Sequence, residues 1–171
     1  MTVKEIIEKS AELLGVELTE ENTENFVRCY NLIENELAMD YFPLRAVDKV
    51  LIKDNKIEYD ELQRQAFRIM GVYDCNNKEL KYKLYPKYIG FGKKENGKQC
   101  LVVYCYIPQE KTIYGISEFD SGMFEEVFKY GICGEYCLMQ GDYETANAFY
   151  EKYKNAILER YAIRERSDNG D

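Results

Sequence analysis

The sequence predicts an α+β fold: a split helical bundle, with two N-terminal and two C-terminal helices, and an antiparallel β-meander inserted between the pairs. Two observations predict it. Apolar residues recur every three or four positions in residues 1–44 and again in residues 121–161, as in amphipathic helices. Residues 45–108 instead contain β-branched and aromatic runs separated by hairpin-sized turns, which favours antiparallel strands. We expect a single domain over residues 1–171, with a flexible tail at 162–171.

The N-terminal helical pair has clear start and stop signals. Residues 2–5 read Thr-x-x-Glu, a capping box, and Gly15 follows the last apolar residue of the first helix. A second helix is expected to begin near Thr19 or Thr23 and to run to about Asp40. A short loop joins the two, so they should lie antiparallel.

The inserted segment contains runs that favour strands. The longest apolar run, Gln99–Ile107, is apolar on both faces and ends at Pro108. Phe67–Tyr73 is a second candidate, and residues 80–84 alternate apolar and lysine side chains, as expected of a strand with one solvated face. Residues 109–120 show no regular pattern and predict a loop.

The C-terminal pair is expected to form helices over residues 121–140 and 142–161, joined by a turn at Gly141-Asp142. On the last helix, Ala146, Phe149 and Tyr153 share one face, which predicts that they belong to the core.

Composition argues against several function classes. The chain has a net charge of −8, which disfavours non-specific binding to a phosphate backbone. It has no histidine, which removes the commonest general base and the commonest metal ligand. No apolar run is long enough to span a membrane, and we expect no catalytic residues, cofactor or membrane partner.

The six cysteines do not follow a zinc-binding spacing. Cys133 and Cys137 lie four residues apart on one helix face and could supply half of a metal site. A C-x-x-C pair and histidine are both missing, so we interpret the thiols as small buried apolar groups and expect no bound metal.

Two glycines on the predicted third helix could mark a close contact. Gly131 and Gly134 are three residues apart and lie on one helix face, where each costs about 1 kcal/mol relative to alanine. Two interpretations remain open: close packing against another helix of the same chain, or close approach of a neighbouring subunit.

The last helix carries a second candidate interface. Tyr143, Tyr150 and Ile157 lie beside the predicted core face, and Tyr161 extends the aromatic surface. Aromatic side chains exposed on a helix are typical of protein–protein contacts, so we expect this stripe to meet a partner.

Three segments together resemble the head–tail connector, or adaptor, proteins of tailed bacteriophages and prophages. The first is NLIENELAMDYFPL at residues 31–44, followed directly by strands. The second is the strand-rich middle, with IEYDELQRQAFRIMGVYD, LKYKLYPKYI and LVVYCYIP. The third is YGICGEYCLMQGDYETANAFYEKYKNAI at residues 130–157, a small-residue helix, a Gly-Asp turn and an aromatic helix.

This resemblance implies a virion structural protein without enzymatic activity. Family members self-associate into a ring between the portal protein and the stopper or tail proteins, and DNA passes through the channel without specific binding. The family also implies localisation in the host cytoplasm during assembly and then in the virion neck. It further implies that the C-terminal segment, here Leu158–Asp171, docks into the portal.

Two alternatives stay open. One is another phage neck or tail-completion protein, which would also act by binding other virion proteins. The other is a small ligand-binding α+β domain that uses tyrosine and carboxylate side chains, for which an enclosed pocket would be needed.

Overall fold

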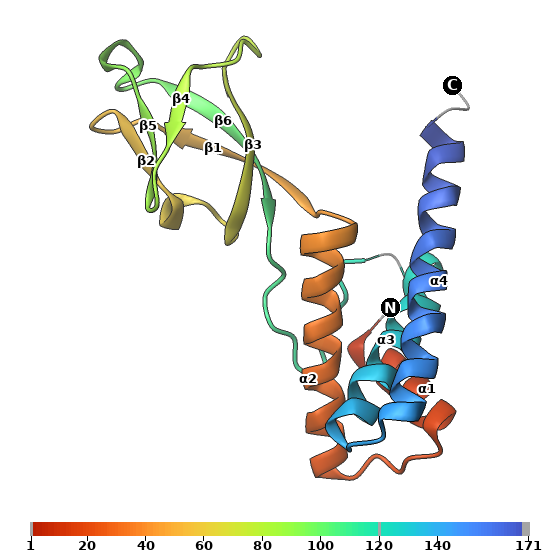
Figure 1. Cartoon of the computed structure of the whole chain (residues 1–171). Helices are drawn as coiled ribbons and strands as arrows, with labels where there is room; N and C mark the ends of the chain where they lie inside the picture. Colours follow the sequence, from red (N-terminus) through yellow and green to blue (C-terminus); the bar gives the residue numbers. More distant parts are fainter. Residues whose placement is uncertain (1, 120, 169–171) are drawn as a thin grey trace. The chain divides into compact units, whose positions relative to one another are not determined.

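The chain divides into two compact units. The computed structural model describes residues 2–119 and 121–168. One unit, called here the bundle unit, comprises residues 1–37 and 109–171; the other, the β unit, comprises residues 38–108 (Figure 1). The fold class is the predicted α+β arrangement with strands inserted between two helical pairs. The inserted strands form a compact unit with an apolar core of its own.

Four helices build the bundle unit: α1 (Val3–Leu14), α2 (Glu20–Glu36), α3 (Ser121–Met139) and α4 (Tyr143–Asp168). The predicted capping box is present, because the Thr2 hydroxyl accepts from the Glu5 backbone N–H and the Glu5 carboxylate accepts from that of Thr2. Gly15 ends α1 with φ +66°, a left-handed conformation that favours glycine. Thr19 is the N-cap of α2, which continues into one π-helical turn, Leu37–Tyr41.

The third helix lies at the centre of the bundle, because α3 packs against each of α1, α2 and α4. Its aromatic side chains stack on those of α2: Tyr136 on Phe26, with ring centroids 4.3 Å apart, and Phe128 on Tyr30 at 5.1 Å. Both pairs are largely or fully buried, so aromatic stacking and apolar burial together hold the N-terminal and C-terminal pairs to each other.

The last helix is longer than predicted. It continues through Asp168, whereas we expected it to end near Tyr161 with a flexible tail from residue 162. The sequence A-I-R-E-R after Tyr161 consists of residues with good to moderate helix propensity, and no glycine or proline interrupts it before Asp168. Residues 169–171 of the expected tail lie outside the described residues.

Six strands build the β unit, and they pair only antiparallel. They form two three-stranded sheets, ordered β1-β6-β3 and β2-β5-β4. The bounds are β1 (Arg45–Leu51), β2 (Lys56–Glu58), β3 (Ala66–Asp74), β4 (Tyr82–Leu84), β5 (Tyr88–Phe91) and β6 (Gln99–Tyr106).

The antiparallel pairing was predicted, but the strand order of a meander was wrong. Only β4 and β5 are neighbours both in sequence and in a sheet; β6, the last strand, lies between β1 and β3. The physical reason is the composition of β6, which is apolar on both faces and is therefore best placed in the middle of a sheet, paired on both edges. The sequence indicated that strand but not its neighbours.

A single apolar core joins the two sheets of the β unit. It contains side chains from both sheets, so the sheets pack around shared buried residues. Its fully buried members include Val72 and Val102 from one sheet and Ile57 and Ile89 from the other.

Candidate interaction surfaces

The predicted interface stripe on α4 is divided between surface and core. Tyr143 and Leu158 are 66% and 63% exposed, respectively. Ile157, in contrast, is buried in the bundle and is not free for a partner. Tyr150 is half-buried: its hydroxyl donates to Glu135 Oε1 at 2.6 Å, and burial together with that carboxylate raises its pKa. Tyr161 is also half-buried, so of these predicted interface residues on α4 only Tyr143 and Leu158 are largely exposed.

Both glycines of α3 contact side chains of the same bundle. A Cβ atom at Gly131 would lie 2.8 Å from the Cδ1 atom of Ile33 on α2. A Cβ atom at Gly134 would lie 3.1 Å from the ring of Tyr150 on α4. Of the two interpretations of these glycines, the contacts support intramolecular packing, because both sites are buried and already filled. The core assignment of Ala146, Phe149 and Tyr153 is confirmed.

A surface that the sequence did not indicate lies in the irregular segment 109–119, called here the strap. The strap connects the β unit to α3 and contains no helix or strand beyond one isolated β-bridge. Irregular segments of this length are often mobile, because few interactions hold them. This one is held by hydrogen bonds at three points of the bundle.

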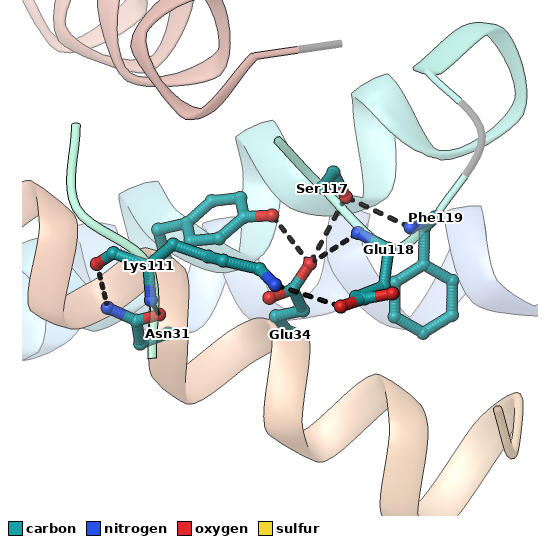
Figure 2. Close-up of polar contacts among 7 residues, drawn as sticks. Asn31, Glu34, Lys111, Ser117, Glu118 and Phe119 are labelled. Carbon is teal, nitrogen blue, oxygen red and sulfur yellow. Dashed lines mark hydrogen bonds and ion pairs between the residues drawn. The ribbon is translucent and has the colours of Figure 1, made fainter. Parts of the chain in front are cut away.

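The strongest of these points is a buried carboxylate. Glu34 of α2 is 1% exposed, and its Oε1 atom accepts from the Tyr30 hydroxyl at 2.7 Å and the Glu118 backbone N–H at 2.9 Å (Figure 2). The Ser117 hydroxyl approaches the same oxygen at 3.3 Å. Burial and this carboxylate raise the pKa of Tyr30, so its proton stays available for donation.

A second point lies one turn earlier on α2. Asn31 pairs with both backbone groups of Lys111: its Oδ1 atom accepts from the N–H at 2.7 Å, and its Nδ2 atom donates to the carbonyl at 3.0 Å (Figure 2). The Lys111 ammonium in turn forms a largely buried ion pair with Glu118 at 3.0 Å. The two ends of the strap are thereby linked to each other as well as to α2.

The third point is the start of α1. The Val3 N–H donates to the Gly115 carbonyl at 3.0 Å, and Thr2 and Ile116 form an isolated antiparallel bridge. Between the anchored residues the strap turns outward, and Tyr114 and Ile116 are 86% and 69% exposed. An ordered backbone therefore holds two large apolar side chains in solvent, a combination typical of contact surfaces.

The strap could have been suspected from one sequence signal. The run T-I-Y-G-I places three large apolar residues in a segment without helical or strand periodicity. Loop apolar residues with no core face to join are candidates for partner contact. Their anchoring by Asn31 and Glu34, 80 or more positions away, is not visible in the sequence.

A second surface feature lies entirely within the β unit. An open groove of about 1100 Å³ is lined by residues of β2, β4, β5 and the loops beside them. Lys56, Lys81 and Lys83 contribute ammonium groups, and Tyr85 and Tyr88 contribute rings stacked with centroids 4.6 Å apart. Two carboxylates, of Asp54 and Glu79, also line it. The groove is open to solvent, unlike the enclosed pocket that a small-ligand site would require.

The cysteine thiols do not come together with other ligand side chains. Among residues 2–119 and 121–168, no three His, Cys, Asp or Glu side chains gather as a metal ion would require. Cys133 and Cys137 are buried on α3, and burial raises both pKa values, that of Cys133 to about 12. The Cys133 thiol donates to the Ser10 carbonyl at 3.5 Å, as expected of a protonated group. None of the helices in the described part of the chain combines the length and apolarity of a membrane span.

Comparison of the chain with models of known protein families gives no match, and comparison with curated proteins gives none either.

Proposed function

We propose that this protein is a structural subunit of a phage-type head–tail connector. In this proposal it self-associates into a ring between a portal protein and the stopper or tail proteins, and DNA passes through the ring. The location that follows is the host cytoplasm during assembly and then the virion neck. The order of helices and strands supports the proposal, because a bundle interrupted by strands is what the resemblance implies.

The observation that carries the proposal is the anchored strap with Tyr114 and Ile116 exposed. A partner that covers these side chains gains the free energy of apolar burial, about 25 cal/mol per Å². The backbone beneath them is already ordered, so binding does not have to order it. Large apolar side chains exposed on an ordered backbone are suited to contact between proteins.

We assign the strap to contact with a second copy of this chain. A ring requires a heterologous interface, in which two different surfaces of the same chain meet. The strap is one apolar surface, and the exposed side chains of Tyr143 and Leu158 on α4 are another. These two residues lie 15 positions apart, roughly 22 Å along the helix, so a neighbour could contact α4 over most of its length.

Light scattering of the purified protein, alone and with the portal ring of the phage or prophage that encodes it, tests this proposal. We expect ring-sized assemblies in at least one of the two samples. The double variant Tyr114→Asp/Ile116→Asp should stay monomeric and unbound, because two carboxylates would be desolvated on assembly.

Thr112→Asp is the matched control, since it adds a carboxylate to an exposed position of the same strap. It should assemble like the unmodified protein. A protein that remains monomeric and does not bind the portal ring would contradict the proposal. Equal loss of assembly in the control would show that charge on the strap, and not loss of the two apolar side chains, is responsible.

A further inference from the structure

The net charge of −8 hides a strong division of charge along the chain. Residues 38–108 contain 13 lysine and arginine against 9 acidic residues, a net charge of +4. The rest of the chain contains 10 against 22, a net charge of −12. Within the β unit, residues 78–98 hold seven lysines and two glutamates. The negative charge of the bundle unit therefore argues against anion binding by that unit, whereas the positive charge of the β unit does not argue against it there.

The groove of the β unit lies in this basic segment. Lys81 and Lys83 flank or belong to β4, both are exposed, and neither forms an ion pair within the described parts of the chain. Lys56 contacts Glu58 and lies 5.9 Å from the centre of the Tyr88 ring. Asp54 and Glu79 reduce the net charge of the lining to +1, so the two unpaired lysines are its main contacts for an anion.

Aromatic rings lie in the same groove as these lysines. Tyr85, which is 41% exposed, stacks on Tyr88 at an interplanar angle of 20°. Gly90 of β5 makes room for this arrangement, since a Cβ atom there would lie 2.7 Å from the Tyr85 ring. The two rings thus stack across the turn between β4 and β5, and part of the Tyr85 side chain faces solvent.

We infer that this groove binds single-stranded nucleic acid. Lys81 and Lys83 would pair with backbone phosphates, and the exposed ring of Tyr85 would stack on an unpaired base. Aromatic side chains on which bases stack, beside ammonium groups that pair with phosphates, are typical of sequence-tolerant single-strand sites. Bases in a duplex are stacked on each other and cannot reach the ring. An acidic protein segment would satisfy the lysines but would leave the ring without a matching partner. The inference does not depend on assembly into a ring.

Fluorescence anisotropy with the full-length protein tests this inference. The probe is a labelled oligothymidine of about 12 nucleotides, within the usual size of such sites. We expect saturable binding that weakens as salt rises, since bound phosphates release counterions. Lys81→Glu/Lys83→Glu and Tyr85→Ala should each weaken binding about tenfold or more, whereas Tyr85→Phe, which keeps the ring, should not.

Lys49→Glu/Arg68→Glu is the matched control, because it makes the same charge change at exposed positions of the other sheet, outside the groove. Circular dichroism of each variant establishes that it is folded. Loss of binding in the groove variants alone supports the inference. Equal loss in the control would show attraction to the whole β unit and would overturn it. Tighter binding of the duplex, or of an acidic peptide competitor, would also overturn it.

Discussion

Glu34 illustrates how one buried side chain determines the conformation of a distant segment. Its carboxylate is removed from water, which is costly unless donors replace the lost solvation. Tyr30 supplies one from the same helix, and the strap supplies the Glu118 N–H. The strap is therefore held in part by its hydrogen bond to this buried carboxyl group, in addition to its contacts with Asn31 and Val3.

The first prediction concerns this carboxylate. Glu34→Ala should lower the free energy of unfolding by about 3 kcal/mol, because the Tyr30 hydroxyl and Glu118 N–H would be buried without an acceptor. Glu34→Gln keeps an oxygen for those donors and should cost less. Urea denaturation measures both values, and equal losses would contradict the role given to the shared acceptor.

The second prediction concerns pH and the buried thiols. Burial raises the pKa of Cys29 and Cys133 from 9 to about 12. A raised pKa favours the protonated form in the folded state, so the contribution to stability is complete below pH 9. It is lost as pH rises from 9 towards 12, because the unfolded thiols ionise first.

Each thiol should therefore reduce the free energy of unfolding by roughly 1 kcal/mol per pH unit in that range. Urea denaturation between pH 8 and about 10.5 measures the slope, and Cys133→Ala should make it shallower. An unchanged slope in Cys133→Ala would show that this thiol does not ionise more readily in the unfolded chain.

At the scale of elements, both ends of α1 and the start of α2 followed from local chemistry, whereas helix packing did not. The capping box at Thr2, the left-handed Gly15 and the N-cap Thr19 are local signals, and the structure confirms all three. Gly131 had two interpretations, because a glycine within a helix indicates a close neighbour but does not show whether that neighbour belongs to the same chain or to another subunit. Only the structure identifies its neighbour as Ile33.

The third prediction tests this contact between α2 and α3. Gly131→Ala should destabilise the protein by about 1–3 kcal/mol, although alanine favours helix formation, because the new Cβ overlaps the branched side chain of Ile33. Ile33→Val removes the Cδ1 atom at 2.8 Å and should recover part of the loss in the double variant. Thermal denaturation of the unmodified protein, the two single variants and the double variant gives a double-mutant cycle. Strictly additive changes in the free energy of unfolding would mean that the two residues do not interact.

For the whole molecule, the division into two units has a consequence for unfolding. Each unit buries its own apolar core, so damage to one core should remain within that unit.

The fourth prediction compares two alanine variants at fully buried isoleucines, Ile89→Ala in the β unit and Ile132→Ala in the bundle unit. Each should cost about 2–5 kcal/mol locally. Hydrogen exchange followed by mass spectrometry should show faster exchange in residues 38–108 for the first variant and in the helices for the second. Faster exchange throughout the chain for either variant would show that the two units unfold together.

The distribution of charge is also a property of the whole molecule. The net charge of −8 for the chain led us to expect that non-specific binding to a phosphate backbone is disfavoured, yet this value averages a basic β unit and an acidic bundle unit. Once the unit boundaries are known, the two can be considered separately. The anion-binding inference arises at that point and not from any single motif.

The sequence by itself determined the α+β class, the starts of α1 and α2, and the core face of α4 with Ala146, Phe149 and Tyr153. These features depend on periodicity and capping, which act between residues close in the chain. The tertiary structure decided the central place of β6, the burial of Ile157, and the contacts of Gly131 and Gly134. It also decided the anchoring of the strap and the groove beside Tyr85. These depend on residues far apart in sequence, whose meeting is set by how the cores close and which donors reach a buried acceptor.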